Sequence, residues 1–145
     1  MALSASERAK RSSEVMWAND KASKWLGLEL VKVSTGEAQL SMLVEPHHTN
    51  GHGICHGGFL YTLADSAFAF ACNSRNQSTV AYHNSMTYHA PAQLGDRLLA
   101  NAREVSLKGR SGIYDVEITN QDGVHIASFR GQSRTVKGQL FDEEA

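Results

Sequence analysis

A single carboxylate, Asp65, stands in a long run of apolar residues, and this isolation makes it the first candidate for chemistry. The run extends from Phe59 to Cys72 and is apolar on nearly every side, which is typical of a buried helix. An isolated carboxylate there costs on the order of several kcal/mol unless other groups compensate it. Asp65 could serve as a general base or as a nucleophile. The alternative is a structural aspartate satisfied by Thr62, Ser66 or a backbone amide.

Two glycines, Gly57 and Gly58, stand where this helix is expected to begin. Backbone N–H groups at a helix start have no acceptor within the helix, and the helix dipole adds positive potential there. Such donors can hold an anion or a developing oxyanion. The plainer interpretation is that the glycines permit a turn and close packing, and both roles can hold together.

Gly57 and Asp65 are eight residues apart, roughly 12 Å along a helix axis. One helix therefore does not place both groups on the same carbonyl carbon, whereas two antiparallel copies of the helix would. We therefore expect a two-fold homodimer with two shared sites. Because Asp65 must be ionised to act, we expect donors of the second subunit to lower its pKa more than burial raises it.

The loop before the helix is rich in histidine and raises the question of a metal site. Zinc needs three or four tetrahedral ligands, and the spacing in this one loop matches no standard zinc motif. We expect no metal and no cofactor, with His56 hydrogen-bonding locally and the other histidines at the surface. A general-base role for His52 or His56 stays open. The potential metal ligands of the loop are His47, His48, His52, Cys55 and His56.

The composition is that of one ordinary globular domain spanning residues 1–145. The chain is 41% hydrophobic and 20% charged, with a net charge of −1, which argues against nucleic acid or an anionic membrane as a partner. We find no signal peptide or long apolar span, so the cytoplasm is the expected compartment. Cys55 and Cys72 are then expected to be free thiols in the core or loop rather than nucleophiles.

Local patterns predict the remaining elements. Residues 1–26 form an N-terminal helical segment, opened by the capping-box spacing of Ser4 and Glu7 and closed by Gly27. A hairpin follows, with strands over 28–33 and 38–44. After the central helix we expect strands over 79–89, 97–107, 113–119 and 124–136, and a frayed tail over 138–145. The simplest α+β arrangement is a curved antiparallel sheet wrapped around one long central helix.

This order of elements, with Asn50, His56-Gly57-Gly58 and Asp65, resembles the hotdog-fold acyl-CoA thioesterases of the PaaI (phenylacetate-degradation) family. The resemblance covers nearly the whole chain and extends to Gly112–Ile118 and Phe129-Arg130-Gly131. It implies hydrolysis of an aryl- or arylacetyl-CoA thioester by hotdog dimers, commonly paired into tetramers. By matching position, Asp65 would be the catalytic carboxylate, Gly57 would polarise the carbonyl, and Asn50 would help to position water or substrate.

Further residues enter as candidate substrate contacts. Tyr61 and Phe68 share the Asp65 face by helical spacing and could line an aryl pocket, and Ser66 could offer a hydroxyl near the carboxylate. His56 and Gly58 are further candidates. Lys108, Arg110 and Arg134 are candidates for the CoA phosphates, although they could equally be solvated charges.

Two other functions remain open at this point. Hotdog sheets also host acyl-CoA hydratases or dehydratases, and an acyl-CoA-binding protein with a structural Asp65 would need no chemistry.

Overall fold

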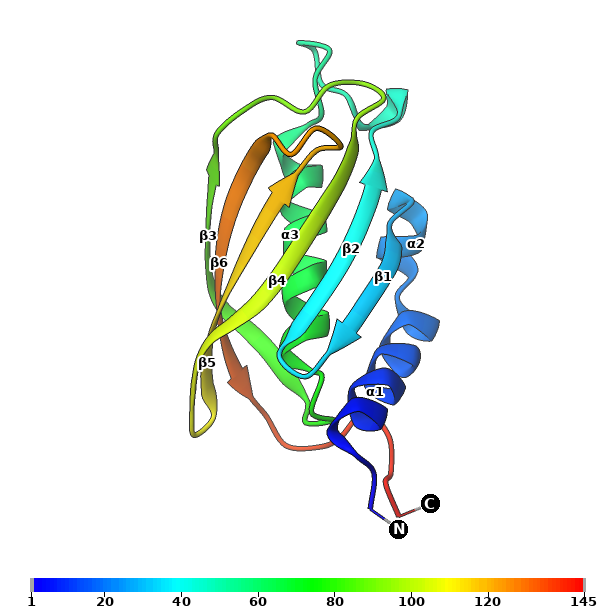
Figure 1. The fold of residues 1–145 in the computed structure, drawn as a ribbon, viewed down its shortest axis with the longest axis vertical. Coiled ribbons are helices and arrows are strands. Elements are labelled where there is room, and N and C mark those ends of the chain that lie inside the picture. Colours follow the sequence, from blue (N-terminus) through cyan, green and yellow to red (C-terminus); the bar gives the residue numbers. More distant parts are fainter. Residues whose placement is uncertain (1, 145) are drawn as a thin grey trace.

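The computed structural model describes residues 2–144 and has the predicted α+β hotdog architecture (Figure 1). A six-stranded antiparallel sheet curves around the central helix α3 (Gly57–Cys72). The strand order is β1-β2-β4-β5-β6-β3, so β3 forms one edge although it follows the helix directly in sequence. The strands are β1 (Glu29–Ser34), β2 (Glu37–Leu43), β3 (Thr79–Tyr88), β4 (Arg97–Lys108), β5 (Ser111–Thr119) and β6 (His125–Thr135).

The N-terminal segment folds as its capping signals predict. Helix α1 (Ala5–Asn19) begins at Ser4, whose hydroxyl accepts from the Glu7 N–H. Helix α2 (Lys21–Leu26) begins at Asp20 and ends at Gly27, where φ is +83° and glycine is favoured.

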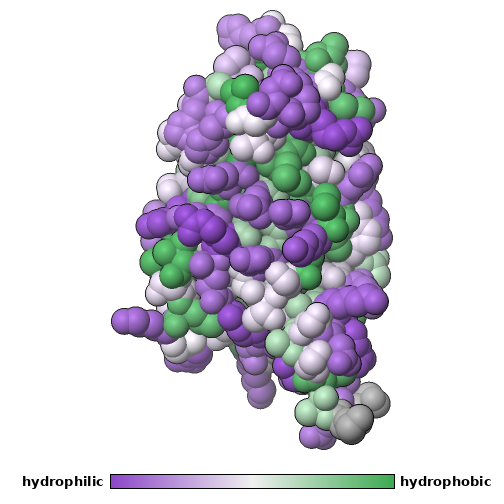
Figure 2. All heavy atoms as spheres, in the orientation of Figure 1, coloured by the Kyte–Doolittle hydropathy of each residue, from purple (hydrophilic) through white to green (hydrophobic). Residues whose placement is uncertain are grey.

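The core lies between the inner face of the sheet and α3, because the helix is apolar where it meets the strands. Alternate residues of each strand point inward, and the outer face is predominantly hydrophilic (Figure 2). The largest fully buried side chains include Phe68, Phe70, Leu40, Met42 and Tyr114. No helix among residues 2–144 has the length and apolarity to cross a membrane.

The tail differs from expectation. Residues 138–144 have no regular secondary structure, but they are held by specific contacts rather than frayed. Arg8 of α1 forms a bidentate pair with Glu143, and the Asn76 side chain bonds the backbone of Leu140 and Phe141. The described part of the tail is thereby fixed to α1, whereas Ala145 lies outside the described residues.

Candidate functional site

The loop before α3 is organised by Asn50. Its Oδ1 accepts from the N–H groups of His52 (2.9 Å) and Ile54 (3.4 Å), and its backbone N–H donates to Ile54 O. The carbonyl end of the side chain is therefore committed to the loop. Only the Nδ2 end is left for the role in positioning water or substrate that the resemblance implies.

His56 caps the N-terminus of α3 and makes the two glycine amides different, because it accepts a hydrogen bond from one of them. Its Nδ1 accepts from the Gly58 N–H at 2.9 Å. The Gly58 amide is therefore occupied, which corrects the expectation that both glycines present free donors. Among residues 2–144, no acceptor is bonded to the Gly57 N–H, so this amide is the donor available to a ligand.

Tyr88 lies directly against Gly57. Its hydroxyl donates to Gly57 O at 3.0 Å, and a Cβ at position 57 would lie 3.2 Å from the ring carbon Cζ. Position 57 therefore tolerates little beyond glycine. Tyr82 and Tyr88 are both more than half exposed, because β3 is an edge strand.

An apolar hollow of about 360 Å³ opens beside the Gly57 amide. Tyr88 and Leu60 are among its walls, so a ligand carbonyl on Gly57 would have apolar surface next to it. The lining residues are Ile54, Gly57, Leu60, Tyr88, His89, Ala90 and Pro91.

Asp65 is half-buried, and its side chain meets the sheet rather than its helical neighbours. Asn84 of β3 donates from Nδ2 to Asp65 Oδ1 at 3.4 Å. Thr62 instead bonds Gly58 O, and the Ser66 hydroxyl lies 3.3 Å from Ser23 of α2. Within one chain the Ser66 hydroxyl therefore meets α2 and not the carboxylate, and a contact of Ser66 with substrate stays a prediction.

Burial raises the pKa of Asp65, and the hydrogen bond from Asn84 lowers it in part. Within one chain, burial is the larger effect. The expected lowering by donors of a second subunit stays a prediction.

The two aromatic candidates on α3 separate. Phe68 is buried in the core against Tyr114 and Phe129, so its assignment to a substrate pocket is wrong. Tyr61 is half-buried and meets the ring of Phe129 edge-on, with centroids 5.5 Å apart. Of these two aromatic residues, Tyr61 remains a candidate for substrate contact.

The basic candidates gather at the far end of the molecule from Gly57. Lys108 is the last residue of β4, and Arg110 lies in the turn to β5 at the lower left of Figure 1. Arg134 of β6 lies opposite Ser111. Arg110 also lines a surface hollow of about 490 Å³ with Arg75 and Lys137. A single chain therefore does not bring these cations to the Gly57 amide.

A group of potential metal ligands lies in the loop before α3. Potential ligand atoms of Glu45, His47 and His48 lie within 4.8 Å of one another. However, His48 Nδ1 accepts from the Glu45 N–H and Nε2 lies 2.9 Å from Leu26 O, so both ring nitrogens are engaged. His48 is fully buried, contrary to the expectation of a surface residue, because it joins this loop to α2.

Neither thiol is arranged as a nucleophile. Cys55 and Cys72 are free and buried, as expected. Burial raises the pKa of Cys55 to about 11 and that of Cys72 to about 12, so both stay protonated at neutral pH.

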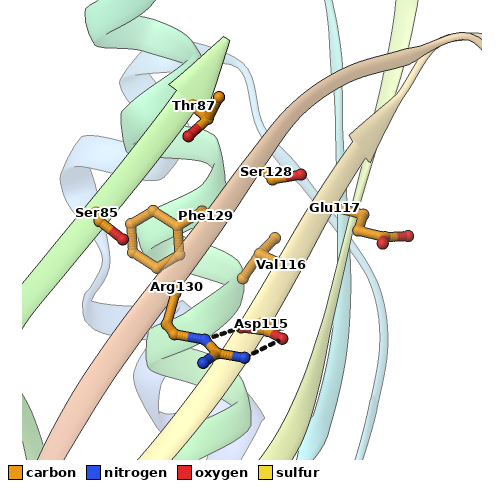
Figure 3. Close-up of a pocket in the computed structure, with 8 residues that line it drawn as sticks. All are labelled: Ser85, Thr87, Asp115, Val116, Glu117, Ser128, Phe129 and Arg130. Atoms are coloured by element: carbon orange, nitrogen blue, oxygen red, sulfur yellow. Dashed lines mark hydrogen bonds and ion pairs between the residues drawn. The ribbon is translucent and has the colours of Figure 1, made fainter. Parts of the chain in front are cut away.

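A separate polar hollow of about 320 Å³ lies over β3, β6 and β5 (Figure 3). Of its three charged residues, Arg130 and Asp115 neutralise each other in a bidentate pair with contacts of 2.6 and 2.8 Å, and Glu117 is the third. The Asp115 carboxylate is therefore committed to Arg130 and is not comparable with the carboxylate of Asp65 on α3.

Asn84 and Tyr88 were missed as site residues from sequence. Asn84 carried a weak signal, since an amide is unusual in the middle of a strand rich in Val, Tyr and Thr. Its facing depended on a register shift between Ala81 and His83 that periodicity does not reveal.

Comparison with known proteins agrees with this geometry. The thioesterase superfamily family model matches residues 52–127. The acyl-coenzyme A thioesterase PaaI of Escherichia coli is 38% identical over 138 residues, covering 95% of this chain and 99% of its own. The solved structure of E. coli PaaI superposes with a TM-score of 0.92 over 94% of this chain and 99% of that one.

Two more distant proteins share parts of the chain. Human acyl-coenzyme A thioesterase 13 is 33% identical over 96 residues, or 65% of this chain and 69% of its own. A Streptococcus mutans protein solved bound to acetyl CoA is 25% identical with a TM-score of 0.75, covering 78% of this chain and 91% of that one. The chain belongs to the thioesterase superfamily, as a hotdog-fold enzyme of the PaaI family.

Proposed function

We propose that this protein hydrolyses aryl- or arylacetyl-CoA thioesters to the free acid and CoA, using Gly57 of one subunit and Asp65 of its partner copy. The observation that carries the proposal is that α3 bears both a backbone amide without an acceptor, at Gly57, and a half-buried carboxylate, at Asp65. They are roughly 12 Å apart along the axis, too far to act on one carbonyl within a chain.

The exposed edge strand β3 supports a two-fold dimer. This strand has ten residues and unpaired backbone groups along one side, an arrangement that monomeric proteins usually avoid. Val80, Tyr82 and Tyr88 are each at least half exposed on it. Antiparallel pairing of two β3 strands would continue the sheet and bring the loop end of one α3 toward the middle of the other. Two such dimers would then pair into the tetramer that the family resemblance implies.

In this arrangement the thioester oxygen would accept from the Gly57 N–H as negative charge develops on it. Asp65 would either take a proton from an attacking water or attack the carbonyl carbon to form an anhydride that water then opens. The C–S bond breaks as the tetrahedral intermediate collapses. The CoA thiolate is a good leaving group, so no dedicated general acid is needed.

The surroundings of Gly57 support an apolar or aromatic acyl group. The hollow beside the amide presents Leu60, Pro91 and the ring of Tyr88, against which an aryl group can pack. Tyr61 and the free Nδ2 of Asn50 are further candidate contacts. The β4–β5 turn of the partner copy, with Lys108, Arg110 and Arg134, would then meet the CoA phosphates.

Turnover of a panel of CoA thioesters, followed with a thiol reagent, tests this function. Wild type should release thiol fastest from aryl and arylacetyl substrates. Asp65→Asn should fold and bind substrate but lose at least about 100-fold in kcat. Unchanged turnover by Asp65→Asn would refute its role, and binding without thiol release would favour an acyl-CoA-binding protein. Hydration of enoyl-CoA would favour the lyase alternative.

A single turnover in water labelled with oxygen-18 separates the two chemical routes. Label found in the Asp65 carboxyl supports the anhydride, because it enters there when water opens the anhydride at the Asp65 carbonyl carbon.

A further inference from the structure

Asn84 is the side chain that β3 directs at Asp65, and a backbone irregularity puts it there. Residues that pair across two strands share a face, and Asn84 pairs with the buried Gly131 of β6. The register shift between Ala81 and His83 exchanges the two faces of β3 at that point. Ala81 pairs with the buried Ser133 and therefore faces inward. Without the bulge, strict alternation from Ala81 would direct His83 inward and Asn84 outward.

The orientation of the Asn84 amide follows from its partner. An ionised carboxylate only accepts hydrogen bonds, so Nδ2 must face Asp65, at 3.4 Å from Oδ1. The amide oxygen is then turned away. It is buried, and no donor in the described chain reaches it.

A buried acceptor without a donor is unfavourable for folding and calls for an explanation. Leucine has nearly the same shape and would remove the unsatisfied oxygen. A purely structural requirement therefore does not account for an amide here, whereas a hydrogen bond to a working carboxylate does.

Few other polar groups lie where they could donate a hydrogen bond to Asp65. The strands β2, β4, β5 and β6 present mainly apolar side chains to α3, and α2 presents Ser23. The titratable groups close to this face are Tyr61 and Cys72 on α3 and Tyr114 of β5. Cys72 interacts with the charge of Asp65, and Tyr114 donates to Glu104. Asn84 is thus the one described residue that donates a side-chain hydrogen bond to Asp65.

We propose that Asn84 is a positioning residue for thioester hydrolysis, which orients the Asp65 carboxylate and keeps it ionised. The inference rests on the proposed function, because it gives Asn84 a task only if Asp65 acts in turnover. The Asn84 hydrogen bond lowers the pKa of Asp65 against the effect of burial. Removing this donor must therefore move the protonation of Asp65 to higher pH.

Asn84→Leu and Asn84→Asp test the proposal. We expect Asn84→Leu to lower kcat about 10- to 100-fold with KM within about twofold, since the substrate contacts are unchanged. The acidic limb of its kcat/KM profile should move to higher pH, and further in Asn84→Asp, where a like charge faces Asp65. The thermal midpoint of Asn84→Leu should stay close to that of wild type, because removal of the unsatisfied amide oxygen offsets the loss of the hydrogen bond to Asp65.

Asn101→Leu is the matched control, since Asn101 lies exposed on β4. It should keep both the kcat and the pH profile of wild type. The proposal is overturned if Asn84→Leu retains the wild-type kcat and acidic limb, or if its activity falls only in step with thermal stability or dimer content. Failure of the proposed function looks different, because Asp65→Asn would then itself retain turnover.

Discussion

At the residue scale, two neighbouring glycines that look equivalent in sequence prove to have different tasks. His56 occupies the amide of Gly58, which leaves Gly57 as the free donor at the start of α3. The lack of a side chain also matters at position 57, because Tyr88 lies against it. Gly57 is therefore constrained by the packing of Tyr88 on its α-carbon, and the proposed function adds a second constraint through its amide.

Gly57→Ala should reduce kcat/KM by about 10- to 1,000-fold, because the new methyl group displaces Tyr88 and narrows the approach to the amide. Steady-state kinetics on the best CoA thioester measure this loss. Gly51→Ala is the control, since a Cβ there meets nothing within 4 Å and its backbone is unstrained. Equal activities for the two variants would exclude a special role for the Gly57 amide.

At the element scale, α3 and the sheet fit together through small residues facing large ones. Gly131 of β6 lies beneath the ring of Phe68, and Phe68 in turn packs between Tyr114 and Phe129. This contact explains why Phe68 belongs to the core and is not free to meet substrate. It also sets the distance between α3 and β6, the strand that pairs with β3.

Gly131→Ala should destabilise the protein by about 1–3 kcal/mol, because the added Cβ would lie 2.8 Å from the buried Phe68 ring. Denaturant unfolding with an unchanged m-value measures the effect. A loss no larger than that of Gly51→Ala would show that the helix can move to accommodate the methyl group, contrary to a rigid contact between Gly131 and Phe68.

At the scale of the whole molecule, the proposed function requires two chains, and contacts between the two ends of one chain contribute to stability. The shared-site arrangement predicts that two inactive variants complement each other. In a dimer of Asp65→Asn with Gly57→Ala, one of the two sites combines an intact Gly57 with an intact Asp65.

Random mixing of these two variants by co-refolding should therefore restore about a quarter of wild-type activity, since about half the dimers are mixed and each has one intact site. The unmixed variants, refolded alone, are the controls. No recovery in verified mixed dimers would place both groups in one chain and contradict the dimeric site.

The contact between tail and α1 gives a prediction on pH. Hydrogen bonds from Arg8 and Asn76 lower the pKa of Glu143 to about 2. Its stabilising effect is fully present above the unfolded pKa of about 4.5 and is lost as the pH falls toward about 2. Glu143→Gln should lower the thermal midpoint at pH 7, and the difference from wild type should vanish near pH 2.

Glu144→Gln is the matched control for the tail, because the Glu144 side chain makes no ion pair or hydrogen bond within residues 2–144, and only its backbone N–H donates, to Asp142 Oδ1. It should leave the thermal midpoint unchanged. A Glu143→Gln midpoint equal to that of wild type at pH 7 would show that the tail adds nothing to the folded state.

The sequence by itself determined the elements of this protein and its main candidate residues. Period-two alternation predicted the strands, capping residues such as Ser4 and Gly27 predicted the helix ends, and an isolated Asp65 pointed to chemistry. These signals are local, because they depend on residues a few positions apart.

Only the tertiary structure decided that β3 is an edge strand, that a bulge turns Asn84 toward Asp65, and that His56 takes the Gly58 amide. The tertiary structure also decided that Phe68 and His48 are buried and that Glu143 of the tail contacts Arg8 of α1. Strand order and side-chain facing depend on pairings between distant segments, and a one-residue shift reverses a face. No pattern within a single strand contains that information.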